Sequence, residues 1–593
     1  MEELIIPNPS THDVASYSIL VEGQALNPSY QLLSLSIHSE INHVPVAKIV
    51  LRDGEASERK FEISDKDELI PGKKLIIKIG FDGNNTTVFT GIITKHTVKV
   101  GSSGNTELRI ECRDEIVKMT IGRHSRYFQK IKDSTLVDNL VSFYPGLQSE
   151  PQVTTLEHKE LVQHHVSDWD FLLMRAEASG MLVHAYQGKI KTLKPDTSAA
   201  PVLQVNYGSS IMEFEAEMDA RTQWKSVKAS SWDYTGQNLF TAETAEAKGF
   251  SQHGNLSGSD LANGVNDKLE HYEMRHSGHL LQKELQDWTD GLMLRSRLAK
   301  IRGHAKITGF SGVQPTHMIK ISGVGERFNG NAFVSAVTHE IVQGTWKTYI
   351  QFGINPERYA SLFKNIEDPL SSGLIPSIHG LQIGIVVRLA TDPDGDDRIQ
   401  VKIPVIDNNA EGIWCRVACL DAGDQRGTFF RPELNDEVIV GFINDDPRHA
   451  IILGQLNSSA KPAPLQAADA NDEKGIFTRS KMRIHFNDKT KTITIDTPAG
   501  NSVILDEEGK TIKVKDQNDN KLTLSPSGIV MDSPKDIEIK AGSNLTLSAG
   551  AQVKVSGVSI SAKADSSLGL EGAMTKLSSS GITEVKGSMV KIN

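Results

Sequence analysis

The stretch DPDGDD at residues 392–397 has the residue types of a calcium site. Carboxylates at alternate positions supply the oxygen ligands that open a calcium-binding loop. Here Gly395 is at the fourth position rather than the sixth, and Ile403 stands where the closing glutamate belongs. We therefore interpret this stretch as a solvated turn between strands and predict no metal-binding residue.

The cysteines are the next candidates for chemistry. The chain has three, Cys112, Cys415 and Cys419, which are too few for a disulfide framework and agree with a reducing compartment. Cys415 and Cys419 are four residues apart on a strand pattern, and no second cysteine pair or histidine pair follows at zinc spacing. We interpret them as ordinary residues of a barrel.

Two further patterns resemble catalytic or cofactor sites. His164 and His165 precede a helix start, but no serine, histidine and aspartate stand at a recognisable triad spacing, so we expect surface or interface residues. The stretch GVGERF at residues 323–328 lacks the third glycine and the strand-to-helix setting of a dinucleotide loop, and we expect a strand-to-turn connection. We predict no catalytic residue and no cofactor, and we expect that the protein is not an enzyme.

The overall charge argues against nucleic acid as a partner. The 593 residues include 64 Lys and Arg against 74 Asp and Glu, a net charge of −10. The chain has no run of eighteen apolar residues, and its start, MEELIIPNPST, lacks the basic and apolar regions of a signal peptide. We expect the chain to be made and folded in the cytoplasm.

Residues 1–365 mix helical and strand patterns and are predicted to form an α+β region. SILVEGQAL, LRIEC and SVKASSW are typical of strands. A helix is predicted within residues 166–181, with Ser167 as N-cap and Gly180 closing the end. A longer helix is predicted within residues 280–304, where apolar residues recur at helical spacing.

A small barrel is predicted next. Residues 366–378 are rich in Pro, Ser and Gly and are predicted to be a linker. Five short strand patterns follow in about 75 residues, which fits a five-stranded barrel of the OB type over residues 379–457. A second linker, rich in Ala, Pro and Asp, is predicted at residues 458–475.

The last part of the chain, residues 476–593, is an array of repeats. Pairs of apolar residues two positions apart recur every nine or ten residues and then about every eight, and the alternation within each pair indicates strands. The earlier pairs are Ile484/Phe486, Ile493/Ile495, Val503/Leu505, Ile512/Val514 and Leu522/Leu524. The tighter pairs, which we predict to be the core of a needle, are Ile529/Met531, Ile537/Ile539, Leu545/Leu547 and Val553/Val555.

A period of eight predicts an assembly of three chains. A single-chain β-helix needs roughly 20 or more residues for one coil, whereas eight residues make one strand and one turn. Three chains winding round a common axis would each supply one side of a triangular prism, with the apolar pairs meeting in the middle. We therefore predict a triple-stranded intertwined β-helix and an obligate homotrimer.

Taken together, these parts resemble the VgrG family, the spikes of type VI secretion systems. The hub stretches FTGIITKHTVKV, HHVSDWDFLLMRAEASGM, SWDYTGQ and RFNGNAFVSAVTHEI are similar to landmarks of that family, as is GTFFRPELNDEVIVGFINDDPRHAIILGQL in the barrel. One departure is Asn435, where the family usually has Gly; Asn also tolerates the left-handed conformation. The barrel residues that carry the resemblance are Trp414, Pro432, Glu433, Asp436, Glu437, Val438, Gly441, Phe442, Pro447 and Gly454.

The resemblance implies a mechanical function. A trimeric hub of two related layers would cap an inner tube of Hcp-like hexamers, and the needle would breach a target membrane that it touches transiently. Baseplate proteins and non-covalently loaded effectors would be partners, and the protein would be cytoplasmic in the producing bacterium until contraction delivers it. The needle end, at which the family seats a PAAR-type tip protein, would be Met589, Val590, Ile592 and Asn593.

Three alternatives stay open on the sequence. The spike of an extracellular contractile injection system and a phage baseplate hub share the same plan. A carbohydrate-active β-helix enzyme, less favoured, would have an inserted domain of roughly 100 residues or coils of 20-odd residues with clustered acids. Neither is present, and we expect no fused effector, since the repeats run to Asn593.

Overall fold

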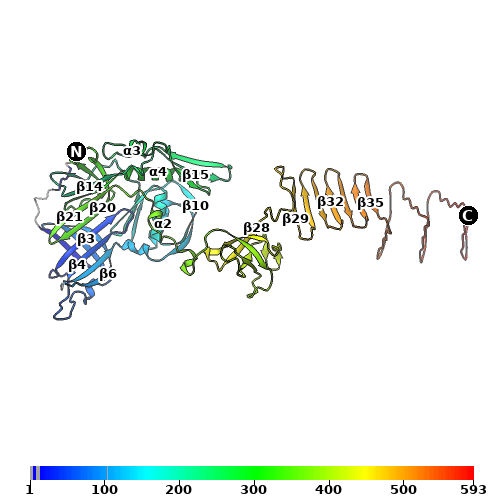
Figure 1. The fold of residues 1–593 in the computed structure, drawn as a ribbon, viewed down its shortest axis with the longest axis horizontal. Coiled ribbons are helices and arrows are strands. Elements are labelled where there is room, and N and C mark those ends of the chain that lie inside the picture. The colour runs from blue at the N-terminus through cyan, green and yellow to red at the C-terminus, as the bar shows by residue number, and fades with distance from the viewer. Residues whose placement is uncertain (1–3, 8–13, 103–104, 593) are drawn as a thin grey trace. The chain divides into compact units, whose positions relative to one another are not determined.

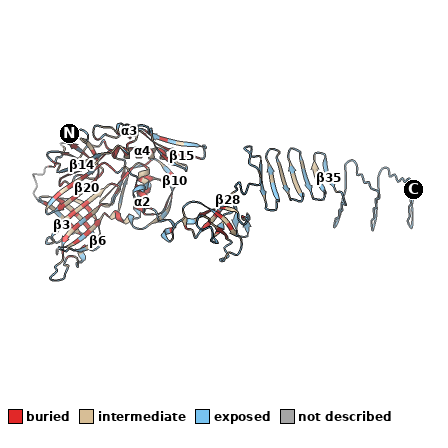
Figure 2. Cartoon of the chain, viewed as in Figure 1, coloured by how far each residue is buried: buried red, intermediate tan, exposed pale blue. Residues whose placement is uncertain are grey.

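The computed structural model describes residues 4–7, 14–102 and 105–592 (Figure 1). Strands predominate over helices throughout. Buried residues are concentrated in the region up to about residue 366 and in the barrel, while the C-terminal strands are intermediate or exposed (Figure 2). We use the term hub for residues 14–365.

A large, mostly antiparallel sheet forms the centre of the hub. One face of this sheet packs Leu35, Ile49, Ile77 and Leu108 into a fully buried core, and the alternation of side chains leaves polar residues on the other face. Two strands, β13 (Leu203–Asn206) and β19 (Met318–Ser322), attach beside β20. The remaining strands, in spatial order, are β14 (Glu213–Met218), β18 (Ile301–Thr308), β21 (Thr345–Phe352), β20 (Gly330–Val342), β3 (Leu32–Glu40), β4 (Val46–Arg52), β7 (Thr106–Arg113), β6 (Asn84–Val100), β5 (Lys74–Phe81), β1 (Ala15–Val21) and β2 (Gln24–Ala25).

Smaller sheets and helices complete the hub. The sheets are β8 (His124–Lys132) with β10 (Glu157–Val166); β9 (Gln148–Pro151) with β11 (Leu182–Tyr186) and β12 (Lys189–Leu193); and β15 (Val227–Asp233) with β16 (Asn238–Thr244) and β17 (Tyr272–His276). The helices are α1 (Asp133–Ser142), α2 (Asp168–Ala178), α3 (Gly258–Val265), α4 (Gln282–Leu298) and α5 (Tyr359–Leu362), with 3₁₀ turns η1 (Asp67–Leu69) and η2 (Glu115–Thr120).

Both helices predicted from the sequence are present as α2 and α4. The hydroxyl of Ser167 accepts a hydrogen bond from the amide of Asp170 at 3.1 Å, which confirms Ser167 as the N-cap of α2. After α2 the backbone turns at Gly180, whose φ is +68°. Gly291 of α4 lies against it, because a Cβ at Gly291 would be 2.6 Å from the Cα of Gly180. The two helices approach this closely only because both positions are glycine.

The segment predicted as the first linker is held by hydrogen bonds. The guanidinium of Arg123 donates to the carbonyls of Asn365 at 2.8 Å and Ile366 at 2.7 Å. Further along, the segment forms the 3₁₀ turn η3 (Leu370–Gly373), and the hydroxyl of Ser371 donates to the carbonyl of Asp445 at 2.9 Å. The predicted linker is therefore a connection that these hydrogen bonds hold in place, and we name it the anchored connection.

The predicted five-stranded barrel is confirmed. In residues 379–457, all described, β22 (Gln382–Arg388), β23 (Ile399–Lys402), β24 (Ile413–Val417), β28 (Ala450–Gln455) and β27 (Glu437–Phe442) close on themselves in that order. A short hairpin of β25 (Ala422–Gly423) and β26 (Arg426–Gly427) and a 3₁₀ turn, η4 (Ile443–Asp445), lie between the strands. The barrel core is Val386, Ile399, Val401, Ile403, Cys415, Val438, Val440, Ala450 and Ile452.

The repeats begin as an antiparallel meander. Residues 473–532, described throughout, form a single sheet in which each strand pairs with the next along the chain (Figure 1). Its strands are β29 (Glu473–Phe477), β30 (Arg483–Asn487), β31 (Thr492–Asp496), β32 (Ser502–Asp506), β33 (Thr511–Lys515), β34 (Lys521–Ser525) and β35 (Gly528–Asp532). The predicted strand character of the pairs from Ile484 to Met531 is confirmed.

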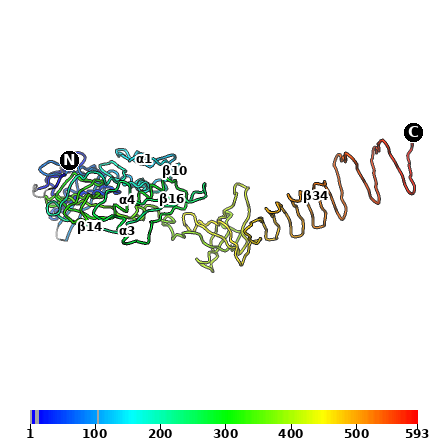
Figure 3. Tube along the Cα trace, turned by 90° about the horizontal axis from the view of Figure 1, so that it is seen from above, coloured from blue at the N-terminus to red at the C-terminus, as the bar shows by residue number. Residues whose placement is uncertain are grey.

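Residues 533–592 differ from the expectation of strands, because none is assigned in that range. The chain instead runs in successive open turns (Figure 3). The physical reason is that an eight-residue block has no neighbouring strand within its own chain with which to exchange hydrogen bonds. The three-chain β-helix therefore stays a prediction.

Candidate functional site

The apolar pairs of the repeats meet directly across the C-terminal sheet. Ile495 of β31 is opposite Ile484 of β30 on one side and Val503 of β32 on the other. Because register partners point to the same side of a sheet, the pairs form one continuous surface, which we name the apolar face. Its residues are Ile484, Phe486, Ile493, Ile495, Val503, Leu505, Ile512, Val514, Leu522, Leu524, Ile529 and Met531.

The apolar face is not covered by the chain that carries it. None of residues 473–532 is buried. Ile484 is 37% exposed and Ile495 46%, and at the end of the sheet Ile529 and Met531 reach 69% and 62%. A depression of about 670 Å³ runs along this face, lined by Ile495 and its neighbours. An apolar surface of this continuity marks an interaction site.

The opposite face of the same sheet is mainly polar. Thr494 of β31 and Thr523 of β34 lie on it, with Lys513 between them along the same row of register partners. Arg483 and Asp496 form an ion pair across two strands at 2.6 Å. The continuous row of apolar pairs is therefore confined to one side of the sheet.

The remaining predicted needle residues are exposed in the single chain. Ile537, Ile539, Leu545, Leu547, Val553 and Val555 are between 54% and 71% exposed. At the predicted tip, Met589, Val590 and Ile592 are 75%, 50% and 91% exposed, while Asn593 lies outside the described residues.

The barrel residues that carry the family resemblance lie in three strands and in the turns before β27 and β28. Asn435 has a φ of +68°, so it does adopt the left-handed conformation expected where the family has Gly. The others lie in β24 (Trp414), before β27 (Pro432, Glu433, Asp436), in β27 (Glu437, Val438, Gly441, Phe442), after η4 (Pro447) and in β28 (Gly454).

The calcium-like loop already has an internal cation. Asp392 accepts hydrogen bonds from the guanidinium of Arg398, at 2.6 Å for the shortest, and from the amide of Arg398 at 3.1 Å. The side-chain hydrogen bonds from Arg398 hold the pKa of Asp392 well below its usual range. Arg398 thus occupies the carboxylate that a calcium ion would need, and the loop is a turn between β22 and β23.

The cysteines, His165 and residues 323–328 are the other candidates from the sequence. Cys415 and Cys112 are buried, and burial raises the pKa of each thiol to about 12; Cys419 is exposed. His165 lies 2.6 Å from Asp368, beside the anchored connection. Residues 323–328 join β19 to β20 as a turn, with no helix following. In the described part of the chain no three side chains of His, Cys, Asp or Glu gather as metal ligands would.

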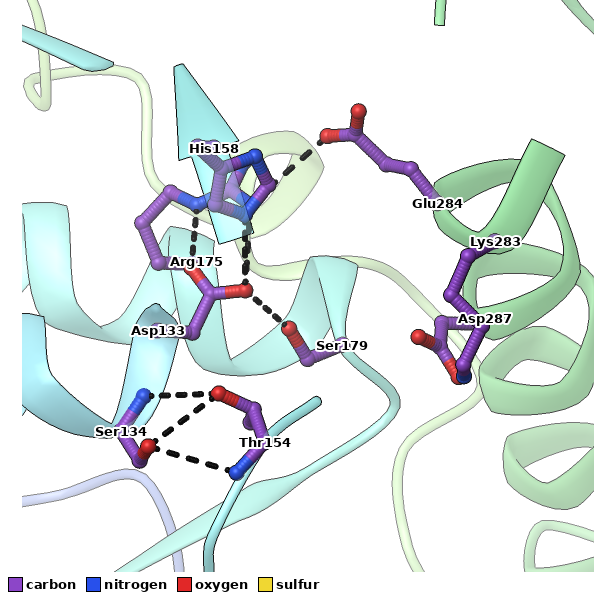
Figure 4. Close-up of polar contacts among 9 residues, drawn as sticks. All are labelled: Asp133, Ser134, Thr154, His158, Arg175, Ser179, Lys283, Glu284 and Asp287. Atoms are coloured by element: carbon purple, nitrogen blue, oxygen red, sulfur yellow. Dashed lines mark hydrogen bonds and ion pairs between the residues drawn. The ribbon is translucent and has the colours of Figure 1, made fainter. Parts of the chain in front are cut away.

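A buried polar cluster in the hub was not predicted from the sequence (Figure 4). Asp133, the first residue of α1, accepts hydrogen bonds from Arg175 at 2.9 Å and from Ser179 at 2.7 Å, and His158 of β10 lies 3.1 Å away. Glu284 of α4 approaches Arg175 at 3.7 Å. Burial acts to raise the pKa of Asp133, but the hydrogen bond with His158, the charge of Arg175 and the remaining hydrogen bonds together hold it well below its usual range.

The geometry of this cluster is that of a structural lock. In a hydrolytic triad the imidazole stands between the carboxylate and the hydroxyl, whereas here Ser179 donates directly to Asp133 and the carboxylate is central. Asp133 ties α1, β10 and α2 together. Ser134 and Thr154 add reciprocal hydrogen bonds beside it, from Ser134 N to Thr154 Oγ1 at 3.1 Å and from Thr154 N to Ser134 Oγ at 3.3 Å.

No helix among the described residues is long and apolar enough to cross a membrane.

Known proteins resemble this chain in two regions. Residues 382–456 match the type VI secretion system/phage-baseplate injector OB domain. The type VI secretion system spike protein VgrG1b of Pseudomonas aeruginosa is 26% identical over 204 residues, which cover 32% of this chain and 27% of that protein. The spike protein VgrG3 of Vibrio cholerae is 28% identical over 141 residues, which cover 22% of this chain and 13% of that protein. The matched regions thus span about a quarter or less of these relatives.

The hub, the injector-type barrel and these matches define the class: the chain is a relative of the VgrG spike proteins. The match over the hub is wider. Residues 11–343, more than half of the chain, match the Alg8 N-terminal domain, and the chain belongs to that family.

Solved structures show weaker likeness. A tail protein from Neisseria meningitidis has a TM-score of 0.45 at 13% identity and covers 58% of this chain and 97% of its own. The 43 kDa tail protein of prophage MuSo2 from Shewanella oneidensis has a TM-score of 0.44 at 9% identity, with 58% and 98% covered. An E. coli component of the type VI secretion system has a TM-score of 0.36 at 12% identity, with 74% and 100% covered.

Proposed function

We propose that this chain is the trimeric spike and hub of a contractile injection apparatus. The observation that carries the proposal is the apolar face, which runs without interruption over six strands and is left uncovered by its own chain. The relationship to VgrG spike proteins supports the same reading.

Covering the apolar face would supply the free energy for association. Burying a whole Val, Leu or Ile side chain contributes roughly 1.5–3 kcal/mol, so covering one that is still about 40% exposed contributes about 0.6–1.2 kcal/mol. Five aliphatic side chains of the face, Ile484, Ile495, Leu505, Ile512 and Val514, are between 37% and 46% exposed. Covering them contributes favourably to assembly, because the strands that carry them are already ordered by their own ladder. The apolar face of the meander therefore contributes to association without the further entropy cost of ordering its strands.

The repeats after Asp532 favour three chains over two. A dimer of meanders would cover both apolar faces, but it would leave each later eight-residue block without strand neighbours on one side. Three chains wound about one axis give every block a neighbour from another chain and leave no open edge. The absence of strands within residues 533–592 of a single chain agrees with this requirement.

The test changes the two faces of the same strands. Ile495→Asp with Leu522→Asp places two carboxylates on the apolar face, in β31 and β34. The matched control, Thr494→Asp with Thr523→Asp, adds the same charge to the same strands on the opposite face. Light scattering should give about 195 kDa, three times the 65.0 kDa of one chain, for the unaltered protein and the control, and 65.0 kDa for the double variant. An unaltered protein of one subunit mass would refute the proposal.

The family resemblance also implies partners and a location for this chain. The hub would sit on an Hcp-like tube with baseplate proteins, the exposed end at Met589, Val590 and Ile592 would seat a PAAR-type tip, and effectors would bind without covalent fusion. The protein would be held in the cytoplasm of the producing bacterium until contraction drives it across a target membrane. Its relatives are named as spike proteins, which supports a mechanical rather than a catalytic role.

The same part would serve type VI secretion, an extracellular injection system or a phage baseplate. In each of these machines the chain would act as a threefold spike on a tube.

A further inference from the structure

The anchored connection is more ordered than its composition predicts. A free linker of residues 366–378, rich in Pro, Ser and Gly, would be a flexible coil with an end-to-end distance that varies around roughly 20 Å. Ile366 is instead buried in a core of the hub, at 6% exposure. Further contacts hold the connection at two places, one on the hub and one on the barrel.

The first place, which we name the hub clasp, consists of Arg123, His165 and Asp368. The carboxylate of Asp368 lies 3.2 Å from Nε of Arg123 and 2.6 Å from Nε2 of His165, so it is held by both. The guanidinium of Arg123 also donates to the carbonyl of His165 at 2.9 Å, besides its hydrogen bonds to the carbonyls of Asn365 and Ile366. One arginine thus ties a strand of the hub to the start of the connection.

The backbone of His165 is strained in this position. Its φ is +47°, in the left-handed region, and it lies where the pairing of β10 with β8 is interrupted between Gln163 and Val166. A residue other than glycine persists in that region where the surrounding contacts determine its conformation. The strand is therefore bulged at the residue that holds Asp368.

The second place, which we name the barrel clasp, is where η3 of the connection meets η4 of the barrel. Ser371 and Ser372 have φ values of +54° and +52°, and Asn444 and Asp445 have φ values of +53° and +56°. The hydroxyl of Ser371 donates to the carbonyl of Asp445 at 2.9 Å, and the side-chain amide of Asn444 donates to the hydroxyl of Ser372 at 3.3 Å. The amide of Ile378 donates to the same carbonyl of Asp445 at 2.9 Å. Two turns of left-handed residues are thus hydrogen-bonded to each other.

We propose that the anchored connection is a stiff coupling between the hub and the barrel. Pro369 and Leu370 alone separate the two clasps, so the chain from Asp368 to Ser371 spans about 10 Å at most. The proline ring fixes its own φ and removes further freedom from this short bridge. A bridge of this length between two held ends leaves the barrel little room to move against the hub.

The inference rests on the proposed function, because a spike has to pass load along its length. A needle driven against a barrier pushes back on the barrel and then on the hub. A flexible linker would let the barrel turn aside under that load, whereas a connection held by side chains at both ends resists bending. Left-handed residues at both clasps agree with such a role, because backbone strain is retained mainly where one conformation is needed.

Lys364 reports on the hub clasp without any label. It is exposed, it is the only lysine between Lys347 and Lys402, and Phe363 beside it packs against the hub. A lysine-specific protease cuts there when this stretch opens, so the rate of cleavage measures the open population. In the unaltered protein, cleavage at Lys364 should be about a hundredfold slower than in a synthetic peptide of residues 359–369.

Two variants open the hub clasp from opposite sides. Arg123→Ala removes its centre and should raise the rate of cleavage at Lys364 about tenfold or more, because the connection loses hydrogen bonds from a charged donor. Asp368→Ala alters the connection rather than the hub and should act in the same direction. Arg221→Ala is the matched control, since Arg221 is 82% exposed and pairs with Asp219. Cleavage that neither clasp variant accelerates would overturn the hub clasp.

Distances between spin labels test the stiffness itself. Of the three cysteines, Cys419 of the barrel is exposed and the other two are buried, and Asn139→Cys adds a second labelling site at an exposed position of α1. With labelled chains diluted among unlabelled ones, double electron–electron resonance gives the spread of hub-to-barrel distances within one chain. The distribution should be narrow in the unaltered connection and about twice as wide after six Gly and Ser residues are inserted between Pro369 and Leu370, with both clasps left in place.

The outcomes separate this inference from the proposed function. Cleavage at Lys364 as fast as in the peptide would overturn the coupling, because the connection would be a free linker. A distribution that the insertion does not widen would also overturn it, because the order would come from elsewhere. Either result leaves the spike intact if light scattering gives the trimer mass. A monomeric unaltered protein would overturn the spike, while the coupling, measured within one chain, would be decided by its own two results.

Discussion

Removing the charge of Asp133 tests the buried lock of the hub. Asp133→Asn keeps the shape of the side chain but leaves Arg175 without its carboxylate partner, since Glu284 is 3.7 Å away and Asp133 held the guanidinium at 2.9 Å. The asparagine amide keeps one acceptor oxygen, so it cannot accept both from Nε of Arg175, which contacts one oxygen of Asp133, and from the side chains of His158 and Ser179, which share the other. Breaking a buried ion pair by removing one partner costs about 3–5 kcal/mol. We expect a local loss of that size where α1, β10 and α2 meet.

Hydrogen exchange measured on peptides is the suitable assay, because a chain with several folded parts does not unfold in one step. Amides of α1 and α2 should exchange about two to four orders of magnitude faster in the variant, as their opening free energy falls. The control is Asp138→Asn in the same helix, since Asp138 is exposed and accepts a surface hydrogen bond from Ser149 at 2.6 Å. Equal exchange in the two variants would refute the lock.

The dependence on pH follows from the lowered pKa of Asp133. A carboxyl whose folded pKa lies below its unfolded value, about 3.9 for Asp, contributes stability above that value and loses it as the pH falls towards the folded pKa. The difference in exchange between the unaltered protein and Asp133→Asn should therefore be full at pH 5–7 and shrink below about pH 4. A difference that persists unchanged in acid would show that the charge is not its source.

The remaining predictions concern two backbone positions and the needle end. Gly291→Ala should destabilise the contact of α2 with α4 by about 1–3 kcal/mol, because its Cβ would meet backbone atoms of Gly180. Gly264→Ala in α3, with open space around it, should not, and hydrogen exchange of the helix peptides compares the two variants. Asn435→Ala should lower the stability of the barrel by about 1–2 kcal/mol, because alanine is strained at a φ of +68°, whereas Asn435→Gly should be tolerated. Hydrogen exchange of barrel peptides reports the difference, and equal exchange in the two variants would contradict the prediction. Val590→Asp with Ile592→Asp should abolish co-purification of a PAAR-type tip protein without changing the trimer mass, and unchanged co-purification would remove these residues from the tip contact.

Local features of the hub and barrel were predictable because the residues that cause them lie within a few positions of one another along the chain. Ser167 caps α2 through the amide three positions on, so residue types within one turn were enough. Asn435 takes the left-handed conformation for a reason confined to its own side chain. Five closely spaced strand patterns likewise predicted the barrel, because alternation and turn residues are read from neighbours.

The assembly surface was partly predictable. The apolar pairs from Ile484 to Met531 were identified as strands from their period, and the direct pairing of one with the next came from the structure. The antiparallel meander and the missing strands after Asp532 depend on which segments find a partner, and period alone does not specify the partner.

The elements with local causes could thus be predicted from the amino-acid sequence: capped helices, alternating strands, a small barrel and an apolar period too short for one chain. The contacts between distant side chains are evident in the structure alone. Asp133 joins residues 25, 42 and 46 positions away, and Arg123 holds a connection 242 positions away, with no spacing that predicts either. Such contacts depend on how separate elements pack, and the residues that make them carry no mark of it along the chain.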